Sequence, residues 1–354
     1  MKDTTKCLIL HTELSGYFLA CLKYLSDLPG IETHVVQWPV NAIAPFNFDL
    51  SNLNINFYER SNYSEKQLLK LAETIDPDII LCGGWIDRVY NKICRKYNKQ
   101  IPVVLGLDNP WRNTIKQNIA TIAGPFILPR LYSHCWVPGS SQLKYAHKLG
   151  FKESHIKTGI YSCDHSMFQE LYKLNRPQKT HDFPKKIIFV GRYTKLKGAT
   201  ELWNAFVEFQ NQSPNEWELW CLGKGDLDEQ FPQHPKIKNF GFVQPSEISN
   251  FISKCGIFIL PSHYEHWGVV VHEFATAGFP LICTNSTGAA EKFLSNGENG
   301  FLIEPCSSKA IIDVLFKITG LSDKELVEMG DRSNKLGSLI TPKTWSETFL
   351  EFLN

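Results

Sequence analysis

Apolar positions follow two periods along the first half of the chain. Five short and almost uncharged apolar runs are typical of buried strands, at 7–11, 33–37, 78–82, 102–106 and 135–138. Between them, longer stretches place apolar residues every three or four positions, as one face of a helix requires, at 17–26, 65–74, 89–97 and 115–132. No β-hairpin turn signal separates the runs, so the pattern predicts a parallel, doubly wound α/β sheet.

The alternation stops at 177–186, where two prolines and a cluster of polar residues indicate a linker. It restarts with a second set of short apolar runs, at 186–190, 217–222, 237–240, 257–260, 280–283 and 301–303. A helix is predicted at 200–210. The chain is therefore predicted to fold as two tandem Rossmann-like domains facing a cleft, followed by an amphipathic tail segment, with bounds 1–178, 179–340 and 341–354.

Composition limits the class of protein. A length of 354 residues fits about two domains. Lys and Arg total 37 against 36 Asp and Glu, and this balance argues against an extended basic surface for nucleic acid. No uncharged apolar run approaches the roughly 18 residues of a membrane span, and the run at 7–11 is too short for a secretory signal. We therefore expect a cytoplasmic chain with no nucleic-acid partner.

The cysteines agree with a reducing compartment. None of the ten forms a CxxC pair, and Cys82, Cys221 and Cys283 lie inside apolar runs. Such positions predict buried, reduced thiols and not disulfides or zinc ligands.

Two cations follow the first strand of the second half. The predicted strand at 186–190 ends in Gly191, which permits a sharp turn, and Arg192 and Lys197 project from the loop before the next helix. Two fixed cations beside the positive end of a helix suit the binding of a diphosphate. A solvated basic turn before an ordinary helix is the alternative, and this segment alone leaves both open.

Two acids and a helix start follow the predicted strand at 257–260. Glu265 lies in the loop, and Glu273 lies in a helix expected to begin near Gly268. The N–H groups of His266, Trp267 and Gly268 are then the unsatisfied donors at the helix start, and such donors suit hydroxyls or phosphate oxygens. A carboxylate such as that of Glu273 can accept both cis hydroxyls of a ribose. The alternatives are a helix N-terminal acid at Glu265 and a surface helix acid at Glu273.

The seven-residue gap between Glu265 and Glu273 resembles the EX7E signature of retaining glycosyltransferases of family 4 (glycosyltransferase group 1), which have the GT-B fold. The surrounding text resembles that family in order: FVGRYTKLKG (189–198), WELWCLGKGDL (217–227), NFGFV (239–243), ILPSHYEHWGVVVHEFATAGFPLICTNSTGAAE (259–291) and NGENGFLIEP (296–305). The resemblance is dense over 187–305 and weak in the first half.

The resemblance implies a nucleoside-diphosphate sugar as donor, retention of anomeric configuration and no cofactor. Arg192 and Lys197 would act on the diphosphate, and Glu265 on the donor sugar. The other implied donor-binding residues are Gly16, Gly191, Phe242, His266, Trp267, Gly268, Val269 and Glu273. The segment 344–352 would be a helix that packs back on the first domain. The resemblance also implies that no metal is needed, with the cations in its place.

Candidates for the acceptor side follow two strands of the first half. Trp85 and Trp111 could stack on sugar rings, and Arg112 could meet an anionic acceptor. Asp108 stands where many family members have a His, and it is the candidate proton acceptor. Core packing of the tryptophans, with the segment 108–110 as a helix cap, explains the same residues equally well.

An apolar stripe at 115–131 has two interpretations. Ile115, Ile119, Ile122 and Phe126 recur at helical spacing, which is more often a face packed on the core. The same stripe could touch a bilayer and reach a lipid-linked acceptor at the inner face of the membrane.

The predicted function is transfer of a hexose-type sugar to a glycan or lipid-linked acceptor, in synthesis of a cell-surface polysaccharide. Same-fold alternatives are a sugar-nucleotide epimerase or hydrolase and a phosphorylase. A dinucleotide oxidoreductase has only a G-x-G at 223–225 in its favour. A catalytically silent subunit would not need the charged residues of the predicted donor site, which are Arg192, Lys197, Glu265 and Glu273. A zinc site at His263, His266 and His272 lacks HExxH spacing and a fourth ligand.

Overall fold

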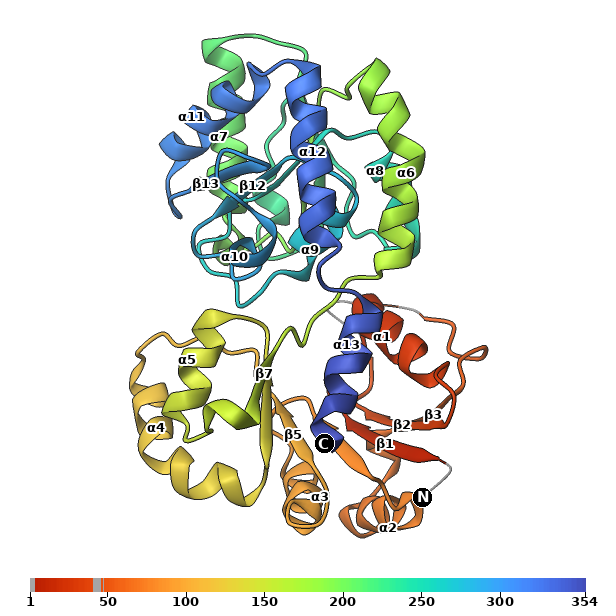
Figure 1. The fold of residues 1–354 in the computed structure, drawn as a ribbon. Coiled ribbons are helices and arrows are strands. Elements are labelled where there is room, and N and C mark those ends of the chain that lie inside the picture. Colours follow the sequence, from red (N-terminus) through yellow and green to blue (C-terminus); the bar gives the residue numbers. More distant parts are fainter. Residues whose placement is uncertain (1–3, 41–45, 47) are drawn as a thin grey trace. The chain divides into compact units, whose positions relative to one another are not determined.

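The computed structural model describes residues 4–40, 46 and 48–354. The chain forms two compact units. Unit 1 consists of Met1–Cys163 and Ile340–Asn354, and unit 2 consists of Asp164–Leu339 (Figure 1). The units divide ahead of the boundary predicted at 178/179.

The linker predicted at 177–186 is wrong over most of its length. Helix α6 (His165–His181) runs through Pro177 and ends at His181, with Asp164 as its N-cap. Proline removes only one helical hydrogen bond. Tertiary contacts compensate here, because Arg176 on the same helix binds both carboxylate oxygens of Asp331 at 2.8 and 2.7 Å.

Unit 1 is built on a parallel sheet, as predicted, but the sheet has seven strands where the sequence predicts five. The strand order is β3-β2-β1-β4-β5-β6-β7. The strands are β1 (Thr5–Leu10), β2 (Ile31–Gln37), β3 (Ile55–Glu59), β4 (Ile79–Cys82), β5 (Val103–Gly106), β6 (His134–Val137) and β7 (Ile156–Thr158). The sequence pattern missed the edge strands β3 and β7, because neither is a continuous buried apolar run.

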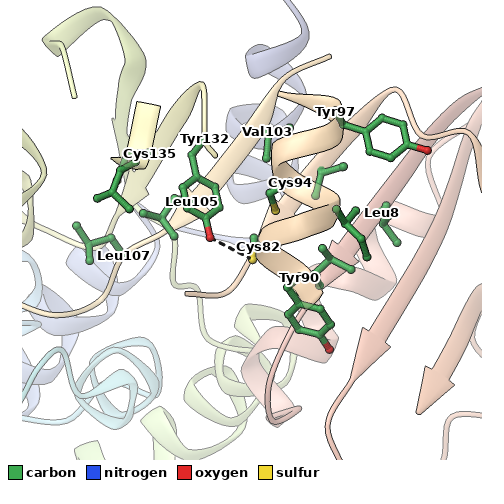
Figure 2. Packing of buried hydrophobic residues seen from close by; sticks show 14 of the residues in the cluster. Leu8, Cys82, Tyr90, Cys94, Tyr97, Val103, Leu105, Leu107, Tyr132 and Cys135 are labelled. Carbon is green, nitrogen blue, oxygen red and sulfur yellow. Dashed lines mark hydrogen bonds between the residues drawn. The ribbon is translucent and has the colours of Figure 1, made fainter. Parts of the chain in front are cut away.

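Helices cover both faces of this sheet. They are α1 (Gly16–Ser26), α2 (Glu65–Ile75), α3 (Arg88–Tyr97), α4 (Ile115–Ile127), α5 (Ser140–Lys148) and α13 (Pro342–Leu350). Figure 2 shows one of the two buried clusters, in which the Tyr132 hydroxyl lies 4.0 Å from Sγ of Cys82. Cys82, Cys221 and Cys283 are buried and free, as predicted.

The tail helix belongs to unit 1, as the resemblance implied. In Figure 1 the blue helix α13 lies beside the red helix α1. Trp345 is fully buried, its ring centroid is 5.0 Å from that of Trp136, and its Nε1 donates a 2.7 Å hydrogen bond to the Ile160 carbonyl. The tail therefore completes the core of the first unit.

Unit 2 repeats the design with six parallel strands in the order β10-β9-β8-β11-β12-β13. They are β8 (Lys186–Val190), β9 (Glu218–Leu222), β10 (Ile237–Asn239), β11 (Ile257–Leu260), β12 (Leu281–Thr284) and β13 (Gly300–Ile303). Its helices are α6, α7 (Ala199–Gln212), α8 (Ser249–Ile252), α9 (Val269–Thr276), α10 (Ala290–Phe293), α11 (Ser308–Thr319) and α12 (Asp323–Gly337).

Strand order reverses between β1 and β4 in unit 1, and between β8 and β11 in unit 2. Loops at the carboxyl ends of strands beside such a switch point are the usual ligand sites of doubly wound sheets. No helix among the described residues combines the length and the hydropathy that crossing a bilayer demands.

Candidate functional site

The loops after β8 and β11 touch each other at the switch point of unit 2. Gly198 ends the first loop with φ +68°, and a Cβ placed on it would lie 2.2 Å from the Pro261 carbonyl oxygen of the second loop. The His263 N–H donates a 2.9 Å hydrogen bond to the Leu196 carbonyl. Any side chain at Gly198 would force the two loops apart.

This contact unites Lys197 with Glu265, which are 68 residues apart in the sequence. The ammonium and the carboxylate form an ion pair, and the side chains are only 20% and 14% exposed. Arg192 lies in the same loop as Lys197; its guanidinium is exposed and pairs with no acid in the part of the chain that the structure describes. The loop therefore carries one neutralised cation, Lys197, and two exposed cations, Arg192 and Lys195.

The N-terminus of α9 lies directly after Glu265. The helix begins at Val269, close to the predicted start, and Gly268 precedes it with φ +88°. A Cβ on Gly268 would come within 2.9 Å of Cγ of Glu265, so glycine lets the acid sit against the helix start. Within the described ranges, the N–H groups of Trp267, Gly268 and Val269 donate no hydrogen bond, as expected for helix-start donors. These donors are available to an anion or a hydroxyl.

Glu273, on α9, is not the surface acid of the alternative interpretation. It is partly buried, and burial, with a contribution from the nearby Asp164 carboxylate, raises its pKa to about 7. A buried acid without a partner is costly, so a ligand that donates hydrogen bonds to it would be favoured. The sequence did not indicate Asp164 as its neighbour.

The raised pKa makes Glu273 a source of pH-dependent stability. Because the folded pKa lies above the unfolded one, its contribution to the free energy of unfolding is complete below about pH 4.5 and lost as the pH rises to about 7. Relative to Glu273→Gln, the protein should lose about 1–3 kcal/mol across that interval, measured by urea unfolding. Glu170→Gln, at an exposed acid of α6, is the control and should show no such difference. Equal pH profiles for wild type and Glu273→Gln would contradict the assignment.

The segment 239–243, which contains the candidate Phe242, is tied to its neighbours. Asn239 Oδ1 accepts from the Tyr193 hydroxyl at 3.0 Å, and the Gly223 N–H donates to the Gly241 carbonyl at 2.7 Å. Phe242 is half-buried.

The sequence predicts a need for glycine at Gly191, but the backbone of Gly191 does not require it, because its φ is not in the left-handed region. The requirement falls on Gly223, whose Cβ would lie 1.9 Å from the Gly191 carbonyl oxygen.

The three histidines near this site do not converge. His272 is buried, stacks on Phe293 with centroids 4.1 Å apart, and its Nε2 donates to the Gly337 carbonyl at 2.8 Å. His263 Nε2 lies 3.2 Å from a carboxylate oxygen of Glu201 on α7. Among residues 4–40, 46 and 48–354, no group of three or more His, Cys, Asp or Glu side chains could hold a metal ion.

Asp108, in the loop after β5, has a crowded environment. Burial and the adjacent Asp108 carboxylate raise the pKa of Tyr161 far above its ordinary value. Asp108 also lies near His11, whose pKa burial lowers to about 4. His11 stacks on Phe18 with centroids 4.2 Å apart, and a Cβ on Gly83 would meet His11 Nδ1 at 2.6 Å. The sequence analysis missed both His11 and Tyr161.

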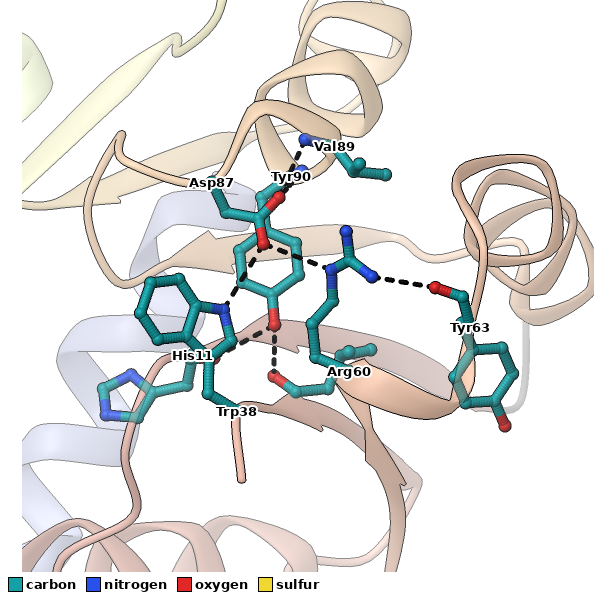
Figure 3. Close-up of polar contacts among 8 residues, drawn as sticks. His11, Trp38, Arg60, Tyr63, Asp87, Val89 and Tyr90 are labelled. Atoms are coloured by element: carbon teal, nitrogen blue, oxygen red, sulfur yellow. Dashed lines mark hydrogen bonds and ion pairs between the residues drawn. The ribbon is translucent and has the colours of Figure 1, made fainter. Parts of the chain in front are cut away.

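A second polar cluster in unit 1 is centred on Asp87, which the sequence pattern did not indicate. Its carboxylate caps α3 and also accepts from Trp38 Nε1 at 3.3 Å and from Arg60 Nε at 3.1 Å (Figure 3). Tyr90, on α3, donates through its hydroxyl to the His11 carbonyl at 3.1 Å. The loops after β1, β2, β3 and β4 are thereby held together.

The other candidate residues of the first half differ in how deeply they are buried. Trp85 and Trp111 are partly buried against the core, and the Trp111 ring lies 5.5 Å from that of Tyr145. Arg112 is exposed, and Gly16 is the first residue of α1. The core interpretation therefore holds for part of each tryptophan side chain. The cap of α4, however, is Thr114 and not the segment 108–110.

Residues 173–335 match the family model described as glycosyl transferases group 1, and they contain the loops after β8 and β11. The 2-deoxystreptamine N-acetyl-D-glucosaminyltransferase of Niallia circulans is 30% identical over 144 residues, 38% of this chain and 36% of that protein. The capsular polysaccharide biosynthesis glycosyltransferase CapM of Staphylococcus aureus is 30% identical over 189 residues, 51% of this chain and 47% of that protein. The chain spans less than half the length of either relative.

Similarity of structure extends over both units. The crystal structure of HepE from Anabaena in complex with UDP-glucose matches with a TM-score of 0.71 at 15% identity, covering 97% of this chain and 98% of that one. At this identity the similarity concerns the fold. The chain thus has the GT-B fold, and its segment 173–335 matches the model of the glycosyl transferases group 1 family.

Proposed function

We propose that this protein transfers a hexose-type sugar from a nucleoside-diphosphate sugar, with retention and without a metal, to a glycan or lipid-linked acceptor. The observation that carries the proposal is the grouping of Lys197, Glu265 and the α9 N-terminus at one switch point, with Arg192 exposed in the same loop. The group 1 family model over 173–335 and the capsular relative CapM support it. Cell-surface polysaccharide synthesis at the cytoplasmic side of the membrane is the corresponding role.

Electrostatics supplies the chemistry of the donor site. Breaking the anomeric C–O bond leaves negative charge on the diphosphate and positive charge on the sugar. Arg192, Lys197 and the N–H groups before α9 stabilise the diphosphate, because fixed donors need no reorganisation at the moment of reaction. Lys197 binds Glu265 and the incoming diphosphate together. This places Glu265 beside the sugar that is attached to the diphosphate. Glu273, which forms no ion pair with a cation among the described residues, accepts hydrogen bonds from the ribose.

The remaining candidates complete this proposal. Gly191 and Val269 line the diphosphate site through their backbones, and Phe242 faces the base. Gly16, the first residue of α1, stays a donor-binding candidate on the resemblance. In unit 1, Asp108 is the candidate for the group that receives the acceptor's proton, and its neighbours His11 and Tyr161 set its surroundings. The acceptor itself is assigned to the loops that contain Trp85, Trp111 and Arg112.

A panel of nucleotides tests the donor class. We expect one of UDP, GDP and ADP to raise the melting temperature by about 2–5 °C near saturation, because a ligand that binds only the folded state stabilises it. Arg192→Ala should lose most of that shift. Stabilisation by NAD alone would replace the proposal with a dinucleotide enzyme, and hydrolysis of a sugar nucleotide without transfer to any glycan would favour the hydrolase alternative.

A further inference from the structure

Helix α4 turns its large apolar side chains away from the protein. Ile115, Ile119, Ile122 and Phe126 recur on one face and, together with Ile127, are between 53% and 80% exposed. The structure describes all of α4, and Gly124 alone is buried. A surface helix of a globular domain normally directs its apolar stripe at the core, so α4 has the reverse orientation.

Close packing holds α4 in this orientation. A Cβ on Gly124 would lie 3.0 Å from Cδ2 of Leu149, and a Cβ on Gly150 would lie 2.7 Å from Cα of Pro125. The helix therefore contacts the end of α5 through small or rigid residues. In Figure 1 the two helices are neighbours at one edge of unit 1. Among the residues that the structure describes, none covers the apolar stripe.

The sequence segment that contains the stripe carries charge of one sign. The segment 109–152 contains no Asp or Glu and six basic residues, all exposed: Arg112, Lys116, Arg130, Lys144, Lys148 and Lys152. The other residues of the chain carry 31 basic and 36 acidic side chains. The near-neutral total therefore conceals a basic segment, 109–152, that contains α4.

We infer that the apolar face of α4, with the basic residues of 109–152, docks on the surface of an anionic lipid bilayer. Apolar side chains enter the boundary between headgroups and acyl chains, while Lys and Arg meet the negative headgroups. Thirteen residues give a helix about 20 Å long, which fits a helix lying in the plane of the membrane surface. The inference rests on unit 1 alone and does not depend on the donor chemistry.

A second copy of this chain is the other occupant to consider. A symmetric dimer through α4 would place the same basic residues of both copies close together, because a twofold interface pairs each patch with itself. Six exposed cations on each side oppose such pairing, whereas they favour an anionic bilayer. The positive charge of this surface therefore favours an anionic membrane over a second copy of the chain as its partner.

Flotation of the full-length protein with vesicles tests this surface. The protein should float with phosphatidylcholine vesicles that contain about one-third phosphatidylglycerol, and about tenfold less with phosphatidylcholine alone. The double variant Ile122→Asp/Phe126→Asp should lose about tenfold or more of the binding. Leu174→Asp, at an exposed apolar residue of α6 in unit 2, is the matched control and should float like the wild type.

The charged residues form a second arm of the experiment. Lys116→Glu/Arg130→Glu should weaken flotation with the anionic vesicles and leave the weak binding to phosphatidylcholine unchanged. Every variant should keep the nucleotide-induced melting shift, which separates this inference from the proposed function. An unbound wild type, or a concentration-dependent dimer that Ile122→Asp/Phe126→Asp abolishes, would overturn the inference.

Discussion

Arg192→Ala should reduce kcat/KM for sugar transfer by about 10²–10³, or about 3–4 kcal/mol of transition-state stabilisation. Arg192 is an exposed cation of the donor loop that belongs to no ion pair among the described residues, so its loss removes charge from the diphosphate without breaking an internal pair. Lys197→Ala should be at least as damaging, because it also leaves Glu265 unpaired beside the incoming diphosphate. The rate is measured with the nucleoside-diphosphate sugar selected by the melting panel.

Lys195→Ala is the matched control for these variants. Lys195 lies in the same turn as Lys197 and is exposed, so its removal changes the net charge equally and should alter the rate by about twofold at most. A chelator should leave the wild-type rate unchanged. Full activity in Arg192→Ala or Lys197→Ala, or a chelator-sensitive wild type, would refute the proposed charge stabilisation.

Lys179→Met should stabilise unit 2 by about 2–4 kcal/mol near pH 6. Lys179 is 5% exposed on α6, and its Nζ has no hydrogen-bond partner in the part of the chain that the structure describes. Burial lowers its pKa to about 7. The expected gain is smaller than the pKa implies, because the ammonium lies 3.4 Å from the Phe279 ring centroid and that attraction is lost in the variant.

The pH dependence distinguishes this effect from a general gain in packing. The folded pKa of Lys179 lies below the unfolded value, so its penalty is complete below about pH 7 and fades as the pH rises toward 10.5. Urea unfolding of wild type and Lys179→Met should therefore converge with increasing pH. Lys173→Met, at an exposed lysine of α6, should change stability by less than about 0.5 kcal/mol. A destabilised Lys179→Met at pH 6 would refute the assignment.

Sequence pattern located the strands of unit 2 closely, because buried parallel strands are uninterrupted apolar runs. Residues 186–190 were predicted as a strand, and β8 has the same bounds. The pairing of Lys197 with Glu265 could not be predicted in this way. It depends on β8 and β11 being neighbours in the sheet and on Gly198 admitting the Pro261 carbonyl, and neither is a local property of the sequence.

Two errors have different physical origins. Pro177 and its polar neighbours predict a linker, yet contacts such as Arg176 with Asp331 keep α6 intact through Pro177. The stripe on α4 was correctly predicted to be apolar on one face, but core packing was the favoured interpretation. Periodicity identifies a face and carries no information about what the face contacts, and here Gly124 and Pro125 decide it.

The split of unit 1 into two segments has a consequence for biosynthesis. Trp345 and Phe349 of α13 belong to the core that surrounds Trp136, whereas unit 2 is a single continuous stretch, Asp164–Leu339. During translation, unit 2 can therefore complete its core while unit 1 still lacks residues 340–354. Unit 1, most of which is made first, therefore finishes folding last. Until residues 340–354 are in place, the core around Trp136 is open to chaperones and proteases in the cell.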